Sequence, residues 1–122
     1  MRRAVFALLS LVALSASVAV THVYAQADDD QATTINIVEP PFQSPQRWTY
    51  DPNDIAVPPG ATVTWTNTGA VAHTVTADDG ATFDSASLDP QATFSFTTTT
   101  PGTFTYHCAF HPWMTGTLTV SS

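Results

Sequence analysis

Short runs of alternating side chains constrain the fold of this chain more than any other feature. Apolar residues recur at every second position in several segments between Thr34 and Val120. Since successive side chains of a strand point to opposite faces of a sheet, each run predicts a half-buried β-strand. The clearest runs are Ile35/Ile37, Ala61/Val63/Trp65, His73/Val75/Ala77, Ala92/Phe94/Phe96, Phe104/Tyr106/Cys108 and Leu118/Val120.

Turn-forming clusters separate these runs and indicate the fold class. They include "EPPFQSP", "DPND", "VPPG", "NTGA" and "TTPG", whose proline, glycine, aspartate and asparagine residues favour turns. Outside the N-terminal segment no window shows a helical apolar stripe, and the threonine-rich runs favour β structure. The pattern predicts an all-β protein, an antiparallel Greek-key β-sandwich of about seven to eight strands, with Trp65 in its core.

The N-terminal segment has the organisation of an export signal. Arg2 and Arg3 precede an apolar run from Ala4 to Val20, and small residues follow at "VYA", residues 23–25. We expect residues 1–25 to be a signal peptide that is cleaved. A retained membrane anchor is the alternative, because the run is close to the length of a membrane span. Residues 26–33, "QADDDQAT", predict a flexible acidic arm, and residues 34–122 the folded domain.

The charge balance limits the class of partner. Cleavage would leave Arg47 as the one basic side chain against all ten carboxylates. Such a surface repels the phosphates of nucleic acid and attracts a basic partner, although acidity could also serve solubility alone. The single cysteine cannot form an internal disulfide. Four roles remain open for it: an intermolecular bridge, an inert buried thiol, a reactive thiol or a metal ligand.

The segment "TYHCAFHPWM" collects three soft donor groups. Cys108, His111 and Met114 recur every three residues, and strand parity turns Cys108 toward the core. Pro112 prevents the strand from continuing, so we expect a loop that brings His111 and Met114 back to the sulfur. His73, which follows a strand and a turn, is the candidate for a second imidazole. Two imidazoles, a thiolate and a weak axial thioether are typical of blue copper.

The pattern "WTN…AHTV…PGTFTYHCAFHPWMTGTLTV" resembles the cupredoxins of the plastocyanin and amicyanin type. The two-residue spacer between His111 and Met114 and the proline after His111 are most similar to amicyanin. The resemblance implies that one type 1 copper ion is bound by His73, Cys108, His111 and Met114 and cycles between Cu(II) and Cu(I). Many relatives have an asparagine at the position of Thr74 and a serine or threonine at the position of Ala109, and these side chains brace the two ligand loops by hydrogen bonding. Their replacement here puts that bracing in doubt.

Each candidate ligand also has a purely structural interpretation. Cys108 and Met114 could fill the core, and His73 could be an ordinary hydrogen-bonded histidine. His107 is expected on the surface because its parity is outward. Phe110, Pro112 and Trp113 either cap the end of the sandwich or, with Ala70, Val71 and Ala109, form an apolar docking patch around His111.

The expected function is a small exported electron carrier, not an enzyme. All coordination positions would be filled by protein, no His-x-His pair exists, and we expect neither a small-molecule substrate nor a nucleic acid partner. The partners would be redox proteins, namely a cytochrome, a dehydrogenase or a membrane complex, met by a soluble monomer in the periplasm or another extracytoplasmic space. Two alternatives remain: a copper-binding or copper-delivery protein of the same fold without redox turnover, and a structural β-module for protein association.

Overall fold

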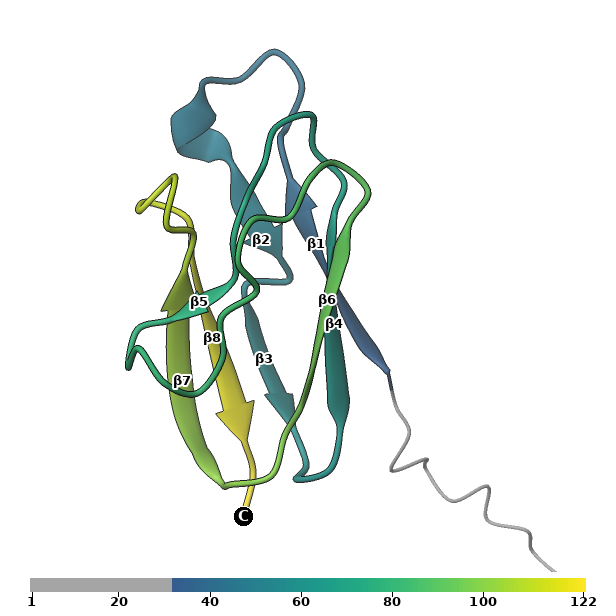
Figure 1. The fold of residues 1–122 in the computed structure, drawn as a ribbon, viewed down its shortest axis with the longest axis vertical. Helices are drawn as coiled ribbons and strands as arrows, with labels where there is room; N and C mark the ends of the chain where they lie inside the picture. Colours follow the sequence, from purple (N-terminus) through teal and green to yellow (C-terminus); the bar gives the residue numbers. More distant parts are fainter. Residues whose placement is uncertain (1–31) are drawn as a thin grey trace, which may run out of the picture.

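Two four-stranded sheets pack face to face over residues 32–122, which the computed structural model describes (Figure 1). The first sheet has the strand order β2 (Thr49–Asp51), β1 (Thr33–Val38), β4 (Thr62–Asn67) and β6 (Thr93–Thr97). The second has the order β3 (Asp54–Val57), β8 (Thr115–Val120), β7 (Gly102–His107) and β5 (Thr76–Ala77). A short 3-10 helix, η1 (Pro45–Arg47), lies between β1 and β2. The predicted β-sandwich is confirmed.

Strand direction and the shortest strands were not predictable from the alternation. The pairs β1–β4 and β3–β8 are parallel, whereas the other pairs are antiparallel. Alternation reports which side chains face inward and carries no information on the direction of the neighbouring strand. Strands β2 and β3 are three and four residues long and were not anticipated. The run from His73 to Ala77 is a strand only at Thr76–Ala77, and His73 makes an isolated bridge to Leu88.

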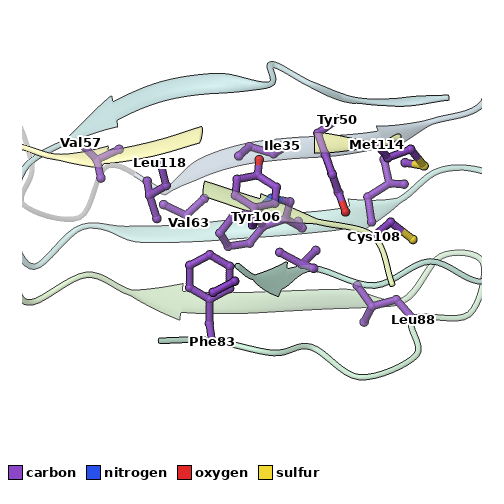
Figure 2. Close-up of a cluster of buried hydrophobic side chains, with 14 of the residues drawn as sticks. Ile35, Tyr50, Val57, Val63, Phe83, Leu88, Tyr106, Cys108, Met114 and Leu118 are labelled. Carbon is purple, nitrogen blue, oxygen red and sulfur yellow. The ribbon is translucent and has the colours of Figure 1, made fainter. Parts of the chain in front are cut away.

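The core follows the inward positions of the strands. Ile35, Val63, Trp65, Tyr106 and Leu118 are fully buried, which confirms the prediction for Trp65. The cluster continues along the sandwich from Val57 to Cys108 and Met114, which lie together at its other end (Figure 2). The two sulfur-bearing side chains, at the two ends of the loop between β7 and β8, are therefore held by the packed core.

Three loops gather at the end of the sandwich where these sulfurs lie (Figure 1). They are residues 39–48 between β1 and β2, residues 68–75 between β4 and β5, and residues 108–114 between β7 and β8. We call this the metal-centre end. The indole N–H of Trp113 donates a 2.8 Å hydrogen bond to the carbonyl oxygen of Pro45, so the first and third of these loops are joined directly.

Most of the N-terminal predictions fall on residues that the structure does not describe. The predicted signal peptide, residues 1–25, and residues 26–31 of the predicted arm lie outside the described residues. Strand β1 begins at Thr33, the last residue assigned to the arm. Among residues 32–122, no helix has the length and apolar character that a membrane span requires.

Candidate metal centre

Three of the four predicted ligands meet at one point. The Sγ atom of Cys108 lies 3.8 Å from Nδ1 of His73 and 3.6 Å from Nδ1 of His111, and the two nitrogens are 3.2 Å apart. These donor atoms all lie within 4.8 Å of one another. A sulfur and two imidazole nitrogens that face one another at such distances can share one ion. The donor set is the one that blue-copper sites use.

The loop from Cys108 to Met114 is wound tightly on itself. The Cys108 N–H donates to the carbonyl of Met114 (3.1 Å), the His111 N–H to that of Cys108 (3.3 Å), and the Met114 N–H to that of His111 (2.8 Å). This pattern returns the chain at every third residue, so His111 and Met114 come back to Cys108 as the spacing predicted. The Met114 side chain is buried, and its sulfur lies at the same end of the core as that of Cys108 (Figure 2).

Asn67 organises the loop that carries His73. Its buried amide donates to the carbonyl oxygens of Val71 (2.8 Å) and Leu88 (2.9 Å), and its Oδ1 accepts from the Gly69 N–H at 2.9 Å. His73 is tied to Leu88 by backbone hydrogen bonds in both directions. The loop is therefore fixed from inside the sandwich, and the imidazole of His73 is fully buried.

Glu39 orients the ring of His73. Its Oε1 lies 2.8 Å from Nε2 of His73, and the carboxylate also accepts from the backbone N–H groups of Ala70 and Val71. Gly69 leaves room for this carboxylate, because a methyl group on it would lie 2.2 Å from Oε1 and would displace the Glu39 side chain. With Nε2–H donating to the carboxylate, Nδ1 is left free to bind a metal. Burial opposes ionisation of Glu39, but the hydrogen bonds from Ala70, His73 and Val71 outweigh it and lower its pKa.

The sulfur of Cys108 is set up to be a thiolate. Burial raises its pKa, but hydrogen bonding to His73, to the backbone N–H groups of Thr74 and Phe110, and to His111 outweighs burial and lowers the pKa to about 6. The Thr74 N–H lies 3.3 Å from the sulfur. A thiolate, rather than a thiol, is the form that binds metal.

The bracing between the two ligand loops is retained in another form. The hydroxyl of Thr74 accepts a 2.7 Å hydrogen bond from the backbone N–H of Ala109 and lies 2.9 Å from the hydroxyl of Thr76. The sequence suggested that Thr74 and Ala109 would weaken this bracing. The expectation is corrected because a main-chain N–H, which any residue except proline supplies at position 109, replaces a side-chain hydroxyl as the partner.

Aromatic rings surround His111. The rings of Trp48 and Trp113 have centroids 4.9 Å and 5.3 Å from that of His111, and Trp48 also packs edge-on against His73 at 5.6 Å. His111 is half-buried, whereas Phe110 and Trp113 are exposed. Rings from two loops thus lie around the one candidate ligand that reaches the surface.

Sequence reasoning missed the roles of Glu39, Asn67 and Trp48. Two of them carried a signal: Glu39 continues the inward parity of Ile35 and Ile37, and Asn67 continues that of Val63 and Trp65. A polar residue at an inward position must find buried hydrogen-bond partners. Trp48 belongs to no periodic run, and its contacts depend on how the 39–48 loop folds.

His107 stands apart from the cluster, as its parity predicted. Its side chain is 34% exposed, and its Nδ1 lies 2.5 Å from a carboxylate oxygen of Asp78. It provides a natural control for experiments on the two histidines of the centre.

Comparison with known proteins gives the family. The family model described as a cupredoxin-like domain matches residues 5–120. The chain belongs to the cupredoxin-like domain family. It is 31% identical over 93 residues to amicyanin-alpha of Methylorubrum extorquens, covering 73% of this chain and 71% of that protein. It is 36% identical over 75 residues to the amicyanin of Paracoccus denitrificans, covering 58% and 57% of the two chains.

Solved cupredoxin structures share the fold. A purple cupredoxin from Nitrosopumilus maritimus superposes with a TM-score of 0.64 at 32% identity, covering 73% of this chain and 99% of that one. The Cu(I) form of an amicyanin variant gives a TM-score of 0.63 at 27% identity, covering 80% and 88%. These relatives confirm the resemblance to amicyanin that the spacing of Cys108, His111 and Met114 indicated.

Proposed function

We propose that this cupredoxin carries single electrons between redox proteins, with one copper ion held by His73, Cys108 and His111 and, more weakly, by Met114. The observation that carries the proposal is the convergence of one sulfur and two imidazole nitrogens within 4.8 Å on a buried, hydrogen-bonded framework. Copper bound to such donors supplies a one-electron couple, because the soft sulfur atoms favour Cu(I) and the imidazoles keep Cu(II) acceptable.

The chain's own residues keep the donors in one arrangement. Glu39 and the Asn67-centred loop hold His73, while the Thr74–Ala109 bond ties its loop to Cys108. The buried core below Met114 and Cys108 resists movement. A site that is already arranged for both oxidation states rearranges little when an electron arrives or leaves, which favours fast transfer.

We further propose that the protein catalyses no reaction of its own. Four protein donors would leave no open position for a substrate. Electrons would enter and leave at His111, whose surroundings include the exposed Phe110, Pro112 and Trp113. The partner would be a cytochrome, a dehydrogenase or a membrane complex, and the carrier would act as a monomer.

The proposed location is the periplasm or another extracytoplasmic space. It is supported by the arginines, apolar run and small residues of segment 1–25. N-terminal sequencing of the protein from its natural membrane and soluble fractions tests it. A start near Gln26 agrees with cleavage, whereas an intact segment in the membrane fraction would establish an anchor.

The function is tested by adding Cu(II) to the metal-free protein and recording visible and EPR spectra. We expect an intense thiolate-to-copper charge-transfer band and one copper per chain. Cys108→Ser should abolish the band, whereas His107→Ala, a matched removal of an imidazole outside the cluster, should leave it unchanged. A colourless complex contradicts the proposal. A complex that takes up Cu(I) but is not reoxidised by ferricyanide would favour copper delivery.

A further inference from the structure

The exposed apolar side chains are concentrated at the metal-centre end. Four large apolar residues of the described chain are exposed: Phe42 (107%), Val71 (38%), Phe110 (52%) and Trp113 (43%). They lie in the three loops of that end (Figure 1). Phe110 and Trp113 adjoin His111, but Phe42 belongs to the 39–48 loop and has no inward packing. Its exposure needs a separate explanation.

The backbone holds Phe42 outward at a conformational cost. Its φ is 62°, in the left-handed region that aromatic residues rarely adopt. Pro40 and Pro41 precede it and Pro45 follows, so the tip has few alternative conformations. Strained residues persist only where the surrounding chain enforces them, and they are concentrated at functional sites. A stiff tip with a projecting aromatic ring loses little entropy when the ring enters a cleft in another molecule.

The 39–48 loop connects this tip to the metal centre. The Trp113 indole N–H donates to Pro45, and Trp48 packs against the rings of His73 and His111. A molecule that binds Phe42 would therefore be held at a fixed position with respect to the imidazole edge of His111. The tip extends the patch around His111 onto a loop that contributes no metal ligand.

Charge distribution selects the kind of partner. The three loops hold two charged residues, Glu39, whose side chain is only 12% exposed, and Arg47. The other carboxylates of residues 32–122 lie outside these loops, at Asp51, Asp54, Asp78, Asp79, Asp84 and Asp89. Arg47 is exposed, so the charge that the three loops present directly is positive, whereas residues 32–122 as a whole carry seven carboxylates against one arginine. Long-range attraction therefore favours a protein of net positive charge, and the loops offer it apolar contacts. A second copy of this acidic chain, or an anionic lipid surface, would be repelled.

We propose that Phe42 is an anchor that inserts into an apolar cleft on a redox partner protein of net positive charge. The proposal rests on the proposed function for the identity of the partner class. Since a central aromatic anchor can dominate the binding energy of an interface, loss of Phe42 should weaken the encounter far more than loss of its neighbours.

The test measures electron transfer from the reduced copper protein to a strongly basic c-type cytochrome by stopped flow. Phe42→Asn removes the ring and suits the left-handed backbone, so the fold should be retained. We expect its second-order rate constant to fall about tenfold. Gln43→Ala, a matched change on the same tip, should stay within about twofold, and Phe42→Leu should recover part of the rate. An unchanged rate in Phe42→Asn overturns the proposal.

Two further measurements would show whether the Phe42 tip binds a second copy of the chain or a membrane in place of a redox partner. Self-association of the wild type in sedimentation velocity that Phe42→Asn abolishes would assign the tip to a second copy and overturn the proposal. Phe42-dependent binding to phosphatidylcholine vesicles would assign the tip to a membrane and would also overturn the proposal.

If the wild type exchanges no electron with ferricyanide, the proposed function fails instead. Calorimetric titration of the cytochrome with wild type and Phe42→Asn then decides the anchor separately, since an equal affinity overturns it.

Discussion

Three side chains form a hydrogen-bonded row that sets the protonation of the metal centre. Glu39 contacts Nε2 of His73, and Nδ1 of His73 faces the sulfur of Cys108. The carboxylate therefore decides which nitrogen of His73 is free, and the histidine favours the thiolate. Both effects require the side chains to be buried together, because solvent would screen them.

The first prediction concerns the titration of Cys108 in the metal-free protein. Its pKa is lowered from 9.0 to about 6, so the folded state binds fewer protons than the unfolded state between these values. The thiolate's contribution to stability is present above the unfolded pKa and is lost as pH falls through about 6. Ultraviolet absorption of the thiolate should show a midpoint about 6 in the folded protein.

Comparison with the unfolded chain and with one variant controls this titration. In concentrated urea the midpoint should return to the ordinary thiol range, and His73→Ala should raise the folded midpoint. His73 itself has a raised pKa, because its pairing with Cys108 and Glu39 outweighs the opposing effect of burial. Its contribution to stability is lost as pH rises, opposite to that of Cys108. A folded midpoint equal to that of the unfolded chain would contradict the assignment.

The second prediction concerns Glu39. Glu39→Ala should weaken copper binding about 10-fold to 100-fold, because His73 and the Ala70–Val71 backbone lose their acceptor. Glu39→Gln, which keeps an acceptor oxygen, should lose less. Competition with a chelator of known affinity measures the difference. Asp51→Asn, at an exposed carboxylate far along β2, serves as the control, and equal affinity of Glu39→Ala and wild type would refute the positioning role.

At the scale of elements, the centre depends on contacts between the loops that follow β4 and β7. These loops are distant in sequence and meet through the side chain of Thr74 and the backbone of Ala109. The pairing of Tyr106 of β7 with Gly116 of β8 fixes the two ends of the second of these loops.

The third prediction concerns Thr74. Thr74→Val keeps the shape but removes the acceptor for the Ala109 N–H, and should destabilise the copper-free protein by about 1–3 kcal/mol. Thr74→Ser should restore most of this loss. Urea unfolding followed by tryptophan fluorescence measures it, with the reduction potential of the copper form as the second observable. If Thr74→Val and Thr74→Ser behave alike in both measurements, the hydroxyl has no bracing role.

The fourth prediction concerns the register of β7 and β8. A methyl group on Gly116 would lie 2.2 Å from Cζ of Tyr106, and Tyr106 is fully buried. Gly116→Ala should therefore destabilise the fold by about 1–3 kcal/mol through overpacking. Thr119→Ala, at a half-exposed position of the same strand, is the control. A stable Gly116→Ala protein would mean that the tyrosine ring can move without cost.

At the scale of the whole molecule, we expect metal binding and folding to be coupled. The donors come from two loops, one following β4 and the other following β7, so they are close together only in the folded chain. Anything that binds the folded state alone stabilises it in proportion to the logarithm of its excess over Kd.

The fifth prediction is that copper raises the unfolding temperature. At a free copper concentration of about 100 times Kd the gain is about 2.7 kcal/mol. For a domain of this size the corresponding shift in Tm is at least about 10 °C. Calorimetry with and without a chelator measures the shift, and His107→Ala should behave as wild type. An equal increase in Cys108→Ser would show that the copper binds elsewhere.

Much of the centre could be predicted because its spacing is local. Cys108, His111 and Met114 lie in one loop, where the three-residue period and Pro112 dictate how the chain returns. Glu39 and Asn67 were detectable only as polar residues at inward positions, and their partners lie across loops. The roles of Trp48 and Phe42 depend on the conformation of the 39–48 loop, which no periodic pattern encodes.

By itself the sequence determined the β-sandwich, the inward faces of its main strands and the set of donor types, since side-chain period and residue chemistry are properties of the local chain. Only the tertiary structure decided that β1 and β3 pair in parallel with β4 and β8, that Glu39 turns His73 toward the sulfur, and that Thr74 replaces the expected brace. Those outcomes depend on contacts between segments far apart in sequence, whose geometry is fixed only when both sheets pack on a shared core.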